Sequence, residues 1–149
     1  MRLTRRDDRG SVLMLMPAGV LIVLALAAIA VDLSLVFLRQ RQASASAADI
    51  ANDLATAALD VDELRASGTY RLDPARARDL GQRLAEDGTA GEHLVDVTVE
   101  VVGDDEVRVT LILDVDYIFS KAIPGADDGT EVHASAVARA VGDGDAAGP

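Results

Sequence analysis

The stretch SVLMLMPAGVLIVLALAAIAV, residues 11–31, decides the fold of this chain. It carries no charged residue, and as a helix it would extend about 31 Å, close to the thickness of a bilayer's hydrocarbon core. Buried helices of soluble proteins rarely run this far without a charge. The sequence therefore predicts a membrane-crossing helix, which we place over residues 11–38 because the apolar residues continue to Leu38.

Three residues of this segment are candidates for helix packing or assembly. Pro17 lies early in the span, where a missing backbone N–H costs little. Gly19 and the alanines that follow it offer a small-residue surface suited to close helix contact. Asp32 is the only charge between Gly10 and Leu38. Its carboxylate is interpreted either as lying at the level of the lipid headgroups or as the partner of a cationic group in a neighbouring subunit's helix.

The charges on either side of the span predict its orientation. Four arginines precede it within the basic tail, residues 1–10, and two follow it; these are Arg2, Arg5, Arg6, Arg9, Arg39 and Arg41. Basic residues favour the cytoplasmic side, so we expect a cytoplasmic N-terminus, a single pass through the membrane and an extracytoplasmic C-terminal domain. A second interpretation is a secreted protein cleaved after Ala30, since residues 28–30 (AIA) fit a signal-peptidase site. The apolar run continues past this point and exceeds an ordinary signal-peptide core.

The composition excludes several classes of function. The 149 residues carry a net charge of −11, and residues 42–149 hold 8 basic against 22 acidic groups. Such an acidic body repels phosphate backbones, so nucleic-acid binding is not expected. The absence of cysteine excludes disulfides, thiolate nucleophiles and cysteine-ligated metals.

Beyond the span, the apolar period predicts that the helix continues over residues 39–66. Apolar residues recur at steps of three and four, giving one apolar face: Ile50, Leu54, Ala57, Val61 and Leu64. We therefore expect the helix to end near Leu64. Residues 43–48 (ASASAA) permit either close helix packing or a flexible joint, and Asp49, which follows them, is a further assembly candidate.

Residues 67–141 predict a small α+β domain. Asp73 and Pro74 have the residue types of an N-cap and first helical position, so a second helix is expected over residues 74–87. Three strands follow from the change to a period of two: one through Val95, Val97, Val99 and Val101, one over residues 107–117 and one over residues 130–141. The tail, residues 142–149, is expected to be disordered. The predicted fold is α+β, with the long helix covering a three-stranded antiparallel sheet.

No pattern of residues indicates catalysis, so we expect no enzyme, no cofactor, no metal site and no small-molecule substrate. Asp114 and Asp116 share a strand face, but nothing nearby supplies a nucleophile. Acidic residues at 104–106 and 127–128 lack the spacing of a calcium loop, which leaves calcium binding open. His93 and His133 are interpreted as solvent-facing strand residues.

The N-terminal third resembles a known family. The matching residues lie within residues 5–60 and are Arg9-Gly10-Ser11, the span with an early Pro17, Ala30-Val31-Asp32-Leu33, Arg39, Arg41-Gln42 and Ala47-Ala48-Asp49. They resemble the N-terminal region of TadE/TadG-like proteins, the pilin-like accessory proteins of bacterial tight-adherence (Flp) pili. The resemblance implies a single-pass inner-membrane protein that acts as a minor pilin or pseudopilin.

From this resemblance we expect a structural role in assembling a Tad-type pilus or related secretion apparatus. The expected partners are membrane lipid and other pilin-like subunits, contacted through the N-terminal helix. Gly10 and Ser11 flank a candidate processing site; prepilin peptidase substrates carry Glu five residues after the cleaved Gly, whereas this chain has Leu15. The alternative is a membrane-tethered extracytoplasmic binding module outside any pilus.

Overall fold

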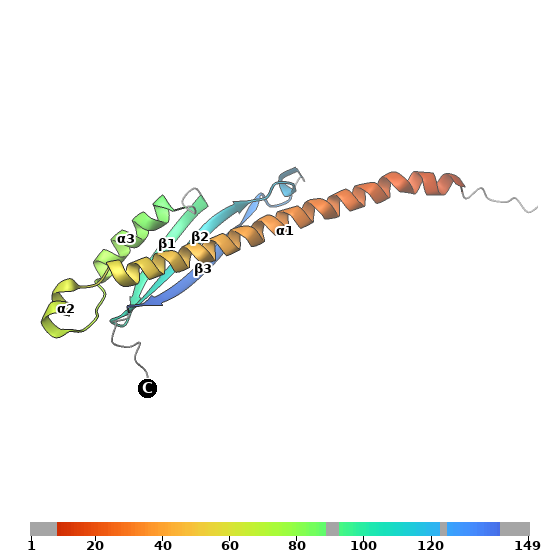
Figure 1. Ribbon diagram of the computed structural model, residues 1–149. Helices are drawn as coiled ribbons and strands as arrows, with labels where there is room; N and C mark the ends of the chain where they lie inside the picture. The colour runs from red at the N-terminus through yellow and green to blue at the C-terminus, as the bar shows by residue number, and fades with distance from the viewer. Residues whose placement is uncertain (1–8, 89–92, 123–124, 141–149) are drawn as a thin grey trace, which may run out of the picture.

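One long helix, α1 (Arg9–Ala57), runs the length of the structure, and a small sheet lies along its C-terminal half (Figure 1). The computed structural model describes residues 9–88, 93–122 and 125–140. The expected basic tail falls outside these residues up to residue 8, and the expected disordered tail, residues 142–149, falls outside them entirely. With 49 residues, α1 is about 74 Å long. Residues 43–48 are helical, so the flexible joint considered for them does not form.

Helix α1 ends before the expected position near Leu64. Leu59 leaves the helix to form a short antiparallel bridge with Leu72, and the Asp60 N–H donates to the Arg71 carbonyl at 2.8 Å. Asp60 then begins a separate helix, α2 (Val61–Ser67), because its carboxylate accepts from the N–H groups of Asp62 and Glu63. In the sequence, the helical period of apolar residues continues through this break and does not reveal it. The N-cap residue type of Asp60 is the local signal that marks it.

Helix α3 (Pro74–Asp87) begins where the sequence predicts. The Asp73 side chain accepts from the N–H groups of Ala75 and Arg76 at 2.9 and 3.2 Å, which satisfies two donors that the helix itself leaves free. Gly81 lies where α3 meets the sheet, and a Cβ there would come within 2.6 Å of Val99 Cγ2. The glycine weakens the helix but allows this close approach.

The three predicted strands form an antiparallel sheet in the order β1-β2-β3, confirming the α+β class. They are β1 (Leu94–Val102), β2 (Glu106–Asp116) and β3 (Gly129–Arg139). A β-bulge lies between Leu94 and Asp96, so Val95 is exposed instead of facing the core with Val97 and Val99. On β3, Val132 and Ala134 are buried, so this side of the strand faces the core.

Both long helices cover the same face of the sheet. Helix α1 contacts β2 and β3, and α3 contacts β1 (Figure 1). The largest fully buried side chains come from α1, from the connection between α2 and α3, and from β2: Leu54, Leu72, Val107, Val109 and Leu111. Ala43 and Ala47 of α1 are fully buried in the same core. Small residues on the helix and on β3 therefore allow close contact between them.

Candidate functional site

The N-terminal half of α1 presents an apolar surface that the other residues described by the structure do not cover. Its large apolar side chains from Leu15 to Val31 are 45% to 70% exposed. The most apolar window of this helix has a mean hydropathy of 2.8, and 6% of it is buried. Exposed apolar surface on this scale marks a membrane or protein interaction site. By length and composition, α1 is able to cross a membrane.

Gly19 and Pro17, two of the expected assembly residues, lie within this exposed half. Nothing comes within 4 Å of a Cβ built on Gly19. The missing side chain leaves a shallow apolar hollow lined by Met16, Val20, Val23 and Leu24. Pro17 lies inside the helix and removes one of its backbone hydrogen bonds. The structure thus offers a recessed apolar surface here, of a shape that another helix could fill.

Asp32 lies where α1 reaches the sheet domain, and it is the one charged side chain that is buried among the described residues, at 3% exposure. Its Oδ1 accepts from the N–H groups of Ile118 and Phe119 at 2.9 and 3.1 Å. Its Oδ2 accepts from the Ser120 N–H at 2.9 Å and from Ser120 Oγ at 2.8 Å. Hydrogen bonds to a charged acceptor are the stronger class, so this carboxylate fastens the β2–β3 connection to the helix.

This arrangement gives Asp32 a role that neither interpretation of the sequence included. The carboxylate is buried, and four donors of its own chain surround it. Three of the donors are the N–H groups of consecutive residues that lead into the short 3-10 helix η2 (Ser120–Ala122), an arrangement that favours an anion. No local pattern in the sequence joins Ser120 to Asp32, because the two residues lie 88 positions apart.

Other contacts hold the middle of α1 to the sheet. The Gln40 side chain donates to the backbone carbonyl of His133 at 2.9 Å. Arg39 Nη2 lies 3.4 Å from His93 Nε2. Because a guanidinium can only donate, His93 Nε2 is the acceptor in this contact. His93 is therefore half-buried beside the helix, and not fully solvent-facing as expected.

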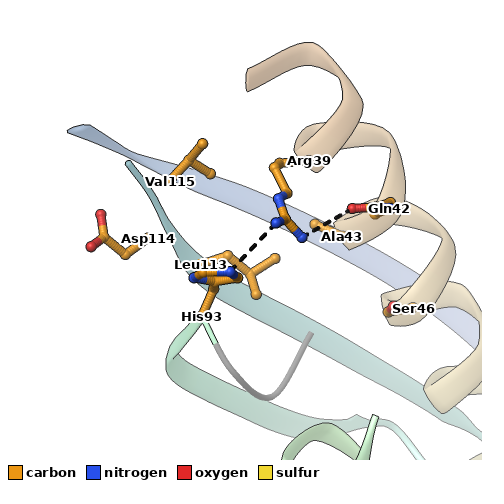
Figure 2. A pocket seen from close by; sticks show the side chains of 8 residues that line it. All are labelled: Arg39, Gln42, Ala43, Ser46, His93, Leu113, Asp114 and Val115. Carbon is orange, nitrogen blue, oxygen red and sulfur yellow. Dashed lines mark hydrogen bonds between the residues drawn. The ribbon is translucent and has the colours of Figure 1, made fainter. Parts of the chain in front are cut away.

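A small hollow lies between α1 and β2 at this point (Figure 2). Its lining residues are Arg39, Gln42, Ala43, Ser46, His93, Leu113, Asp114 and Val115. Its volume of about 20 Å³ is room for about one water molecule. Small-molecule sites are usually more than ten times larger, so this hollow is not a substrate pocket. In Figure 2 the Asp114 carboxylate points away from Arg39, and Asp114 is exposed.

The remaining acidic candidates lie at the surface, and several face cations. Asp116 accepts from Lys121 Nζ at 2.8 Å, and this contact lowers the pKa of Asp116 and raises the pKa of Lys121. At the other end of the sheet, Asp104 faces Arg71 at 3.1 Å and Asp105 faces Arg139 at 3.4 Å. Asp49, an expected assembly residue, is exposed on α1. Of the expected assembly residues, Asp32 is therefore buried in contacts with its own chain, whereas Asp49 is exposed at the surface.

Comparisons of this chain with protein-family models, with curated proteins and with solved structures found no match. The functional conclusion therefore rests on two features of the molecule. One is the exposed apolar half of α1, and the other is the junction at Asp32 where that half meets the sheet domain.

Proposed function

We propose that this chain is a single-pass membrane protein whose extracytoplasmic α+β domain is carried on the same helix that crosses the bilayer. The observation that carries the proposal is the exposure of α1 from Leu15 to Val31. A core helix of a soluble protein would be mostly buried, whereas 6% of this window is. A cleaved signal sequence is disfavoured because α1 continues without a break past Ala30 and its next residues contact the sheet domain.

We further propose that the protein acts as a minor pilin or pseudopilin-like subunit in a Tad (Flp)-type pilus or a related secretion apparatus. Two features support this role beyond the resemblance of residues 5–60. The exposed half of α1 offers apolar surface, with a hollow at Gly19, for helices of other subunits. The second half of the same helix carries a sheet, which leaves the open face of that sheet and α2 for outer contacts.

The proposed orientation has the N-terminus in the cytoplasm and the sheet domain outside. Four arginines precede the span, against Arg39 and Arg41 after it. Arg39 lies beside His93 in the structure, so one of the two arginines after the span is held against the domain.

The test is the N-terminal sequence and intact mass of the native protein from fractionated cells, together with the pili of a deletion strain. A start at Ser11 combined with loss of pili supports a subunit extracted into a filament. A start at Met1 in the membrane fraction combined with loss of pili supports an anchored assembly factor. Intact pili in the deletion strain, with no pilus component copurifying, contradict the pilus role and leave the membrane-tethered binding module.

A matched variant separates processing from folding. Gly10 lies in the first turn of α1, far from the sheet domain, so Gly10→Val changes the candidate processing site without touching the core. If the native protein starts at Ser11, this variant should accumulate with an intact N-terminus in the membrane and should not restore pili. Restoration of pili by unprocessed Gly10→Val would show that cleavage is not required.

A further inference from the structure

The connection between β2 and β3 carries apolar side chains that the described chain leaves about half exposed. Ile118 is 58% exposed and Phe119 is 46% exposed. The described segment from Tyr117 to Ala122, here called the tip loop, contains one charge, Lys121. Exposed hydrophobic residues scattered singly need no explanation, but two adjacent ones in a fastened loop present a small apolar surface.

The hydrogen bonds to Asp32 place the tip loop beside a particular point of α1. Asp32 follows directly after Val31, where the uncharged stretch of about 31 Å ends. The N–H groups of Ile118, Phe119 and Ser120 bind this carboxylate, so the loop lies at the level where this uncharged stretch ends (Figure 1). The end of the sheet with α2 lies away from this level.

Aromatic residues gather at the same level. The chain has two Phe, two Tyr and no Trp. Three of these four, Phe37, Tyr117 and Phe119, lie in the tip loop or on α1 within two turns of Asp32. Phe37 is 71% exposed. Tyr side chains favour the border between hydrocarbon and headgroups, because one end of the ring is apolar and the other is polar, and the two Phe rings add apolar surface at the same level.

We propose that the tip loop inserts Ile118 and Phe119 into the interfacial region of the membrane that α1 crosses. The occupant of this surface is lipid, because the loop lies beside α1 at the C-terminal end of the exposed apolar half of that helix. Lys121, paired with Asp116, then lies toward the headgroups. The domain is held to the bilayer at two points, and its tilt about α1 is restricted. This inference rests on the proposed membrane span.

The test uses the full-length chain in vesicles of phosphatidylethanolamine and phosphatidylglycerol. The protein has no native cysteine, so single spin labels are introduced by Ile118→Cys and Phe119→Cys. Accessibility to oxygen, which concentrates in lipid, is compared with accessibility to a water-soluble nickel chelate. The matched control is Val137→Cys, an apolar residue of β3 with similar exposure, 51%, away from the tip loop.

A label at Leu24→Cys separates failure of this inference from failure of the membrane span. We expect labels at 24, 118 and 119 to favour oxygen, with the nickel collision rate several-fold lower than at position 137. A lipid-embedded label at 24 with water-exposed labels at 118 and 119 overturns the inference and keeps the span. A water-exposed label at 24 overturns both. Shielding of 118 and 119 from both reagents shows a protein partner there and also overturns the inference.

Discussion

Asp32 accepts hydrogen bonds from three backbone N–H groups and one hydroxyl of the tip loop. The first of these donors, the Ile118 N–H, lies 86 positions later in the chain. A buried charge is tolerated when its oxygen atoms are bonded in this way. The single charge of the apolar stretch therefore has a structural role in its own chain. It sets where the sheet domain begins along α1, and it fixes the position of the tip loop along the same helix.

Asp32→Asn is expected to loosen the tip loop without unfolding the domain. The amide keeps one acceptor oxygen but turns an NH₂ group toward N–H donors, leaving at least one of them without a partner. Hydrogen exchange of the Ile118, Phe119 and Ser120 amides should become about tenfold faster or more. The measurement is exchange mass spectrometry in detergent micelles.

The control for this change is Asp49→Asn, an exposed aspartate on the same helix with the same change in charge. It should leave exchange in the tip loop unchanged. Equal protection of the tip loop in Asp32→Asn and in the native chain would show that these hydrogen bonds do not hold the loop.

The Asp116–Lys121 pair gives a pH prediction with a definite sign. Lys121 lowers the pKa of Asp116 below its ordinary value of 3.8. The stabilisation of the folded state by Asp116 is therefore fully present above pH 3.8, and it is lost as the pH falls through the lowered pKa of the folded state. Asp116 raises the pKa of Lys121 above its ordinary value of 10.5. The stabilisation of the folded state by Lys121 is therefore fully present below pH 10.5, and it is lost as the pH rises through the raised pKa of the folded state. Both side chains are largely exposed, so a pKa measurement is more sensitive than stability.

Lys121→Met should therefore move the pKa of Asp116 upward toward 3.8, as measured by carboxyl carbon NMR titration in micelles. Lys121→Arg, which keeps the positive charge, should leave it lowered. An unchanged Asp116 pKa in Lys121→Met would show that the pair does not form in solution.

At the scale of elements, small residues decide how closely α1 lies on the sheet. Ala43 and Ala47 are fully buried, and Ala134 on β3 is nearly so. Larger side chains at these positions would push the helix away from the strands. Gly81 has the same role between α3 and β1, where a Cβ would meet Val99. The alanine-rich composition of the chain thus serves close contact between layers.

Ala47→Leu is expected to lower the free energy of unfolding by about 1–3 kcal/mol, because extra methyl groups enter a filled interface. Ala45→Leu, two residues away on the exposed side of α1, adds the same atoms and should change it by less than about 0.5 kcal/mol. Urea unfolding followed by circular dichroism in micelles measures both. Equal stability of the two variants would show that α1 is not seated on the sheet through Ala47.

At the scale of the whole molecule, one helix serves two environments. Its first half is exposed and apolar, and its second half contributes to the core of the domain (Figure 1). The tip loop lies at the change between them, and α2 lies at the far end of the sheet. Because α1 is one continuous helix, its exposed half joins the domain without a linker.

The proposed orientation predicts which cysteines a membrane-impermeant maleimide can reach in intact spheroplasts. Val137→Cys, on the exposed face of β3, should be labelled from outside. Thr4→Cys, before the span, should be labelled after the membrane is permeabilised. The reverse pattern would place the domain in the cytoplasm, and labelling of both positions in intact cells would contradict a single pass.

The sequence by itself determined the elements whose signals are local. The charge-free run and its period predicted a long helix, the Asp73–Pro74 pair predicted the start of α3, and alternating residues predicted β2 and β3. These signals depend on neighbours within a few residues, since a helix repeats every 3.6 residues and a strand every two. The sequence also contained the N-cap at Asp60, but the continuing apolar period concealed it.

Only the tertiary structure decided the end of α1 at Ala57, the bulge at Val95 and the partners of Asp32. Each depends on hydrogen bonds between segments far apart in the sequence: Leu59 with Leu72, β1 with β2, and Asp32 with the tip loop. A local pattern shows that a carboxylate needs donors, but it does not show which donors the folded chain brings to it. The position of the junction between apolar helix and domain was therefore set by folding.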